Sequence, residues 1–157
     1  MVNPVQSILL KHPKDAFIDQ QKIDTQFAQL NYLDHPNFEK ACNDYDKFLT
    51  LIKSFSPEIH FLPKNKFTSL DSIYTHDPCI VTNNGIIICN MGKKERSYEP
   101  EAVKNFFQSI EVPILGQIKD PGKLEGGDVV WINEKTIALG EGYRSNQDGI
   151  KQLQALL

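Results

Sequence analysis

The sequence predicts a modular α/β fold, and two observations support this prediction. Short apolar runs typical of strands alternate with stretches of helical periodicity along most of the 157 residues. A strand hairpin followed by a helix begins near residue 79, and the same order begins again near residue 128, 49 residues later. A repeat of this size, with the pattern strand–strand–helix–strand, is typical of folds built from similar units.

The first half of the chain predicts strands around one long helix. Residues 5–10 are interpreted as an opening strand, and residues 17–32 as a short helix followed by a loop. Asn37 is suited to cap a helix that runs to about Phe55, because apolar residues recur there at helical spacing. We expect further extended segments at residues 59–62 and 73–75.

The first of the two repeated units spans residues 79–118. Asn84-Gly85 lies between two β-rich runs in CIVTNNGIIICNM, which is a strong signal for a tight hairpin. Pro100 favours the first turn of a helix that continues to about Ile110. Val103, Phe106 and Phe107 are expected to face inward from this helix, and residues 112–118 to form a strand.

The second unit repeats this order without a closing strand. Residues 129–132 and 136–139 form the expected hairpin, with Trp131 in the core. Ser145 or Asn146 can cap the last helix, which ends in GIKQLQALL. The missing strand suggests part of a longer fold, or a fold that a partner completes.

Composition limits the classes of partner. Hydrophobic residues make up 40% of the chain and charged residues 24%, which is typical of one globular domain over residues 1–157. The net charge of −3 indicates no nucleic-acid partner, and Lys93, Lys94 and Arg96, beside Glu95 and Glu99, are interpreted as a solvated loop. No apolar run approaches the roughly 20 residues that cross a bilayer, so we expect no membrane association.

The cysteines and histidines predict neither disulfides nor a metal site. Cys42, Cys79 and Cys89 are odd in number and lack metal-ligand spacing, which favours reduced thiols in a cytoplasmic protein. Cys79 and Cys89 are interpreted as small buried apolar residues. Acidic neighbours would raise their thiol pKa, which is the wrong direction for a nucleophile. We expect no cofactor, and His12, His35 and His60 have no partners at metal spacing.

Three polar segments lie in loops or at strand ends, where binding residues often gather. They are DSIYTHDP at residues 71–78, EGGD at residues 125–128 and GYRSN at residues 142–146. Each has an ordinary structural interpretation: the aspartates can cap turns, and Arg144 can be a surface residue. Together they favour a binding pocket, because their carboxylates surround one arginine.

These segments resemble the guanidino-group-modifying enzymes, which include arginine deiminase, dimethylarginine dimethylaminohydrolase and the amidinotransferases. LDSIYTHDP resembles the Asp-bearing segment of that superfamily, LEGGDVVW its Glu-Gly-Gly-Asp segment, and GEGYRSNQDGI its Arg-Thr-Asn segment. The order and spacing are similar to those of the N-terminal part of the family, over nearly the whole chain. The resemblance implies an incomplete α/β-propeller built from ββαβ modules.

The resemblance also implies roles for single residues in binding a small guanidino or ureido ligand. Asp77 and Glu125 would hold the two edges of a planar guanidinium, which carboxylates bind bidentately. Asp71 would contact the substrate or support those contacts, and Arg144 would hold a substrate carboxylate. His76 stands where the deiminases have an arginine that contacts the substrate carboxylate, and this departure points away from free arginine as the substrate.

The remaining residues of EGGD are expected to shape the loop. Gly126 and Gly127 permit a tight turn, so that Glu125 can point into the site. Asp128 is interpreted as structural, bonding backbone N–H groups of its own turn.

The resemblance further implies a cysteine nucleophile near the family's C-terminus and a histidine that follows the EGGD segment. This chain has no histidine after His76 and no cysteine after Cys89. We therefore expect the 157 residues to be the N-terminal part of a guanidino-group hydrolase or amidinotransferase, inactive alone. The alternatives are a complementing C-terminal chain, and a non-catalytic module that binds a ligand or self-associates as a homo-oligomer. The sequence does not fix the substrate, nor whether hydrolysis or group transfer follows.

Overall fold

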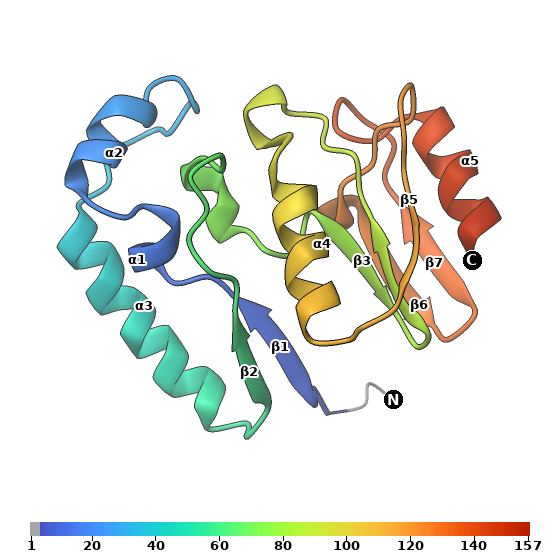
Figure 1. Ribbon diagram of the computed structural model, residues 1–157, viewed down its shortest axis with the longest axis horizontal. Coiled ribbons are helices and arrows are strands. Elements are labelled where there is room, and N and C mark those ends of the chain that lie inside the picture. The colour runs from blue at the N-terminus through green and yellow to red at the C-terminus, as the bar shows by residue number, and fades with distance from the viewer. Residues whose placement is uncertain (1–3) are drawn as a thin grey trace. The chain divides into compact units, whose positions relative to one another are not determined.

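The chain forms two compact units in the computed structural model, which describes residues 4–157 (Figure 1). The first unit ends at Thr75, and the second runs from His76 to Leu157. Each is an α/β structure, so the predicted fold class is confirmed at that level. The expectation of a single domain over residues 1–157 stays a prediction.

The first unit contains a sheet of two parallel strands and several helices. Strand β1 aligns with β2 in the register Ser7↔Glu58 to Leu10↔Phe61. A parallel pair needs a long crossover, and three helices lie between these strands in the sequence. The elements are β1 (Ser7–Leu10), α1 (Pro13–Ala16), α2 (Gln20–Gln26), α3 (Phe38–Lys53), β2 (Glu58–Phe61) and the 3-10 helix η1 (Leu70–Ile73).

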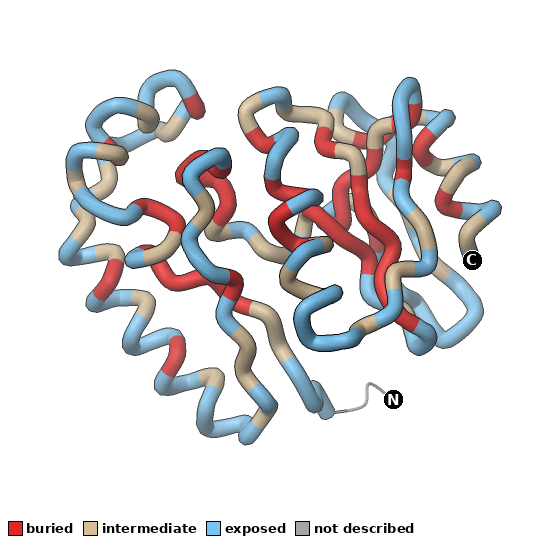
Figure 2. Tube along the Cα trace, viewed as in Figure 1, coloured by how far each residue is buried: buried red, intermediate tan, exposed pale blue. Residues whose placement is uncertain are grey.

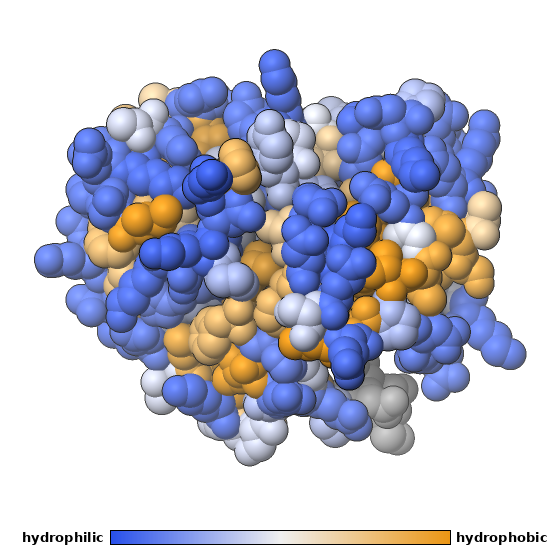
Figure 3. All heavy atoms as spheres, viewed as in Figure 1, coloured by the Kyte–Doolittle hydropathy of each residue, from blue (hydrophilic) through white to orange (hydrophobic). Residues whose placement is uncertain are grey.

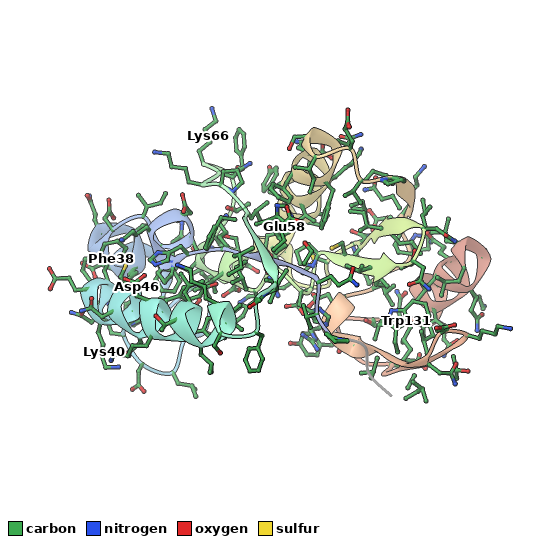
Figure 4. The ribbon with its side chains drawn as sticks, turned by 90° about the horizontal axis from the view of Figure 1, so that it is seen from below. Phe38, Lys40, Asp46, Glu58, Lys66 and Trp131 are labelled. Atoms are coloured by element: carbon green, nitrogen blue, oxygen red, sulfur yellow. The ribbon has the colours of Figure 1, made fainter. Side chains whose placement is uncertain are left out.

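Side-chain caps fix where the helices of the first unit begin. The side chain of Asn37 accepts a hydrogen bond from the backbone N–H of Lys40, so the predicted cap of α3 is confirmed. Asp19 caps α2 in the same way, and His12 caps α1 through Nδ1 while its Nε2 lies 3.2 Å from Asp46. Figure 4 labels Asp46 on α3. The core beneath these helices consists of Ala16, Phe17, Ile23, Leu30 and Leu70.

The second unit contains the two predicted repeats. In the first, β4 lies between β3 and β5, antiparallel to β3 and parallel to β5. In the second, β6 and β7 form a two-stranded antiparallel sheet that α5 follows. The elements are β3 (Cys79–Thr82), β4 (Gly85–Ile88), η2 (Lys94–Arg96), α4 (Glu99–Ser109), β5 (Ile114–Gln117), η3 (Gly126–Asp128), β6 (Val129–Asn133), β7 (Thr136–Leu139) and α5 (Gln147–Leu156).

The core of the second unit joins both repeats. Residues from β3, β4, β6 and α5 pack into one cluster, and strand β4 is buried along its whole length (Figure 2). Asn146 is the residue that caps α5, since its side chain accepts from the N–H of Gly149. The buried members of the cluster are Ile80, Ile87, Cys89, Ile118, Leu124, Val129 and Leu153.

Four local expectations were wrong. Residues 73–75 are not extended, because Ile73 ends η1. The hairpin turn is Asn83-Asn84 rather than Asn84-Gly85. Gly85 begins β4 with φ +142°, and a Cβ there would lie 2.4 Å from the carbonyl oxygen of Pro113, so the parallel β5 connection requires the glycine. Phe106 and Phe107 are only half-buried.

Trp131 is the fourth correction. It is 40% exposed rather than part of the core, and its indole Nε1–H donates to the carbonyl oxygen of Val81 at 3.1 Å (Figure 4). Strand alternation predicted an inward ring, but the hairpin β6–β7 has no third strand among residues 4–157 to bury it. Among the same residues, no helix combines the length and apolar character that crossing a bilayer requires.

Candidate functional site

The polar segments of the second unit meet at the end of its two hairpins where β3 and β6 begin. Asp77 precedes β3 by two residues, and η3 directly precedes β6. The backbone N–H of Gly126 donates to the carbonyl oxygen of Asp77 at 2.8 Å, and this bond joins the two segments. Asp77 therefore approaches residues that follow it by about fifty positions.

Arg96 is the central cation of this site. Its guanidinium donates to Asp77 Oδ2 from Nη1 at 2.6 Å, and to Glu99 from Nε and Nη2 at 2.7 to 3.1 Å. Both Arg96 and Glu99 are buried. The interpretation of this segment as a solvated loop was therefore wrong for these two residues, because Asp77 and Glu99 compensate the charge that burial would otherwise penalise.

Glu125 is fully buried and has partners on both carboxylate oxygens. Oε1 accepts from the backbone N–H of Gly92 at 3.0 Å. Oε2 accepts from Arg144 Nη1 at 3.3 Å and lies 3.9 Å from Arg96 Nη1. Glu125 thus contacts both arginines, as a carboxylate in a guanidinium site should.

Asp128 binds side chains of the loop that follows β7. Its Oδ1 accepts from Arg144 Nη2, and its Oδ2 accepts from the hydroxyl of Ser145 at 2.7 Å. The structural role expected for Asp128 thus differs in its partners, because its carboxylate binds the side chains of Arg144 and Ser145 rather than backbone N–H groups of its own turn. We call Asp77, Glu99, Glu125, Asp128, Arg96 and Arg144 the acid cluster.

The two glycines of EGGD allow this close approach in different ways. A Cβ at Gly126 would lie 2.3 Å from the carbonyl oxygen of His76 and 2.7 Å from that of Cys79, so backbone fills the space. A Cβ at Gly127 would lie 2.5 Å from Asp77 Oδ1 and 3.7 Å from Arg144 Nη1. Gly127 therefore leaves room for the cluster itself.

The electrostatics of the cluster keep both arginines charged. Burial alone would lower the pKa of Arg96, but its hydrogen bonds and ion pairs with Glu99 and Asp77 outweigh burial and raise that pKa. Burial would also lower the pKa of Arg144. The hydrogen bond with Asp128 and the negative charges of Asp128, Glu125 and Asp77 outweigh burial and raise that pKa. Four carboxylates face two guanidinium groups, so the cluster carries a formal charge of two negative.

The sequence-predicted site residues are divided between the two units. Asp77, Glu125, Arg144 and Asp128 lie together, whereas His76 is exposed. Asp71 is buried in η1 of the first unit, so its predicted contact with a ligand stays a prediction.

Sequence reasoning missed Arg96 and Glu99 of the acid cluster, and it missed Ser145, which binds Asp128. The signal for the first two was an Arg and a Glu three residues apart before a helix, where their side chains can meet. Within the segment GYRSN, the sequence predicts for Ser145 only a possible helix cap, and Asn146 takes that role.

The cysteines of the first hairpin are poor nucleophiles. Burial raises the pKa of the Cys79 thiol to about 12. Burial, followed by Cys79, Glu125 and Asp77, raises the pKa of Cys89 well above its usual value. For Cys79 the cause is burial rather than the acidic neighbours we expected. Among residues 4–157, no three His, Cys, Asp or Glu side chains are placed to hold a metal ion.

Comparison with known proteins decides the family. Residues 69–157, more than half of the chain and all of the acid cluster, match the family model for arginine deiminase. The chain belongs to the arginine deiminase family. This places the chain in the superfamily of guanidino-group-modifying proteins that the three polar segments resemble.

Two curated members of the wider superfamily show the extent of the likeness. A dimethylarginine dimethylaminohydrolase of Pseudomonas aeruginosa is 26% identical over 127 residues, which cover 81% of this chain and 49% of that protein. The enzyme of the same name from Streptomyces coelicolor is 33% identical over 85 residues, covering 54% of this chain and 32% of that protein. The chain thus spans about half, or less, of the length of these relatives.

Solved structures share the fold across almost the whole chain. The P. aeruginosa enzyme in complex with citrulline superposes with a TM-score of 0.80 and 23% identity, covering 98% of this chain and 57% of that one. The N-terminal domain of ArgZ, an arginine dihydrolase of cyanobacteria determined with its substrate, gives 0.76 and 19%, with coverage of 95% and 54%. These likenesses show that the first unit also shares its fold with these structures.

Proposed function

We propose that this chain forms the guanidinium-binding part of the substrate site of a guanidino-group hydrolase or amidinotransferase. The observation that carries the proposal is the acid cluster, which holds a guanidinium group of the protein itself between Asp77 and Glu99 and retains an excess of two negative charges. Carboxylates arranged in this way select planar, forked cations.

The carboxylate oxygens of the acid cluster suggest how a ligand would be held. Asp77 Oδ1 accepts no hydrogen bond from residues 4–157, while Oδ2 is bound by Arg96. A ligand guanidinium would use Asp77 Oδ1 together with Glu125 Oε2, in competition with Arg144. Arg144, displaced in part from Glu125, would pair with a carboxylate of the ligand. Asp71 and His76 are proposed as further contacts.

Relatives support the class of substrate. The family match, and relatives whose names specify dimethylarginine and arginine as substrates, favour an arginine-like ligand. The resemblance assigns the covalent step to a cysteine and a histidine that this chain lacks. Since Cys79 and Cys89 are buried with raised thiol pKa values, we propose that the 157 residues bind but do not turn over substrate, as the N-terminal modules of a propeller.

The test is ligand binding by the purified chain. Thermal shifts would be measured with arginine, dimethylarginine, agmatine, guanidinoacetate and citrulline, because a ligand that binds only the folded state raises the melting temperature. We expect guanidines to raise it more than citrulline, which has no charge on its urea group. Agmatine lacks a carboxylate, so its shift relative to arginine reports the role of Arg144.

Matched variants locate the binding. Asp77→Asn keeps the shape of the side chain but removes its charge, and should abolish the shift. Asp44→Asn removes a carboxylate on α3 that, among the described residues 4–157, pairs with Lys40 and Lys47, and should leave the shift intact. Equal shifts with arginine and citrulline, or a shift that survives Asp77→Asn, would contradict the proposal.

A groove in the second unit favours one alternative function, self-association. It has a volume of about 600 Å³ and is lined by residues of both hairpins, including their turns, which lie at the end of the strands away from the acid cluster. Leu115, Trp131, Ile137, Leu156 and Leu157 contribute its apolar lining, and Figure 3 shows apolar surface near the end of α5. A second copy could cover this surface. Light scattering after size exclusion would find a dimer if it does, and a monomer at high concentration would exclude this alternative.

A further inference from the structure

Glu125 and Ser145 belong to a closed ring of hydrogen bonds. The backbone N–H of Glu125 donates to Ser145 Oγ at 3.1 Å, and the Ser145 hydroxyl donates to Asp128 Oδ2 at 2.7 Å. Asp128 Oδ1 accepts from Arg144 Nη2, and Arg144 Nη1 donates to Glu125 Oε2 at 3.3 Å. The ring therefore includes both the backbone N–H and the carboxylate of Glu125.

Ser145 contributes the uncharged side chain of this ring, and its hydroxyl both donates and accepts a hydrogen bond. Its side chain is fully buried, and its oxygen accepts from an amide while its proton goes to a carboxylate. A hydroxyl can do both at once, whereas alanine can do neither. Loss of the hydroxyl would leave a buried amide and a carboxylate oxygen without this partner, which is costly away from water.

The ring contacts the second carboxylate oxygen of Glu125. Gly92 fixes Oε1 through its backbone N–H. Oε2 accepts from Arg144 Nη1 at 3.3 Å and lies farther, 3.9 Å, from Arg96 Nη1. Arg144 is itself held by Oδ1, one of the two carboxylate oxygens of Asp128. Ser145 holds the second of those oxygens, so the hydroxyl controls the direction in which Arg144 and Glu125 point.

We infer that Ser145 is a positioning residue for guanidinium binding, acting through Asp128 and Arg144 on the Glu125 carboxylate. It does so without touching the ligand. This inference rests on the proposed function for its ligand, but the control of Arg144 by Ser145 is a property of the chain alone.

The first experiment measures ligand affinity in three variants. Ser145→Ala removes the hydroxyl, Ser145→Thr retains it, and Ser72→Ala is the matched control, since Ser72 is also buried and donates its hydroxyl to Ser69 in the first unit. By isothermal titration with arginine or dimethylarginine, we expect about a tenfold weaker affinity for Ser145→Ala, a typical effect of one hydrogen bond to a charged group. Ser145→Thr should restore the affinity, and Ser72→Ala should leave it unchanged even where its melting temperature falls.

The second experiment needs no ligand. The Nε–H signal of Arg144 in a ¹H–¹⁵N spectrum, assigned by its loss in Arg144→Lys, reports whether the guanidinium is held in one orientation. We expect this signal to shift and broaden in Ser145→Ala and to be retained in Ser145→Thr and Ser72→Ala. Asp128→Asn provides a second route to the same change if the Ser145 variants fold poorly.

The outcomes separate the two ideas. If the wild-type chain binds no guanidine but the Arg144 signal changes in Ser145→Ala and returns in Ser145→Thr, the proposed function fails and the positioning stands. If guanidines bind and neither the affinity nor the Arg144 signal responds to Ser145→Ala, the positioning by Ser145 is overturned and the proposed function stands.

Discussion

The two repeats of the second unit use the same pair of residues in different surroundings. In the first, Asp77 before the hairpin binds Arg96 after it; in the second, Asp128 before the hairpin binds Arg144 after it. The Arg96 side chain is 6% exposed and also binds Glu99, whereas that of Arg144 is 31% exposed. The strands differ likewise: β4 is buried throughout, while β7 alternates between exposed and half-buried (Figure 2).

This difference shows that neighbours, rather than the repeated pattern, decide what each repeat contributes. Strand β4 has a partner on either side, and α4 packs against it. Strand β7 has one partner among residues 4–157. The first repeat therefore supplies a rigid, buried ion pair, and the second an arginine that is accessible enough to meet a ligand.

The largest expected effect compares the two arginines. Arg96→Ala leaves Glu99 and Asp77 without their buried cation and should lower the free energy of unfolding by about 3–5 kcal/mol. Arg144→Ala should cost only about 1–2 kcal/mol, because its side chain is more exposed and Glu125 keeps its contacts with Gly92 and Arg96. Urea unfolding of both variants measures the difference, and equal losses would show that the two repeats are equivalent.

A second comparison concerns the strands. Ile87 on β4 is fully buried in the core, whereas Ile132 on β6 is 63% exposed. Ile87→Ala should lower the free energy of unfolding by about 3 kcal/mol through lost burial and a cavity. The same substitution at Ile132 should change it by less than about 0.5 kcal/mol. A large loss at Ile132 would indicate that another surface, such as a second copy, covers the second hairpin.

The first hairpin should also make the chain sensitive to base. Folding raises the pKa of Cys79 from 9.0 to about 12, so above pH 9 the unfolded state loses a proton that the folded state retains. Stability is then unaffected below pH 9 and falls between pH 9 and 12, by up to about 1.4 kcal/mol per pH unit for this group.

Urea unfolding at pH 8 and pH 10 measures this fall, and Cys79→Ala should reduce it. The second hairpin contains no cysteine and provides no such group. An unchanged fall in Cys79→Ala would assign the base sensitivity to other groups, of which Cys89 is the first to examine.

Local signals explain what the sequence predicted. Both hairpins, the Asn37 cap and the place of Asn146 at the start of α5 depend on residues within a few positions of one another. The meeting of Asp77, Glu125 and Arg144 was predicted through the family resemblance. Arg96 and Glu99 were missed because their burial depends on Asp77, 19 residues before Arg96, in a segment that has the composition of a surface loop. Trp131 was misplaced because alternation along a strand indicates burial only where a further layer covers it.

The last prediction concerns the contact between the two repeats at Gly127 and Asp77, where the expected change in stability is small. Gly127 precedes the second hairpin, yet a Cβ at this position would lie 2.5 Å from Asp77 Oδ1, which precedes the first. Because that atom ends a side chain, it can move, so Gly127→Ala should lower the free energy of unfolding by less than about 1 kcal/mol. The displaced carboxylate should nevertheless weaken guanidine binding about tenfold. Gly142→Ala, where no atom lies within 4 Å of the added methyl, should change neither quantity. If Gly127→Ala bound guanidines as tightly as the wild type, Asp77 Oδ1 would not be a ligand contact, and binding would have to depend on Glu125 and the second repeat alone.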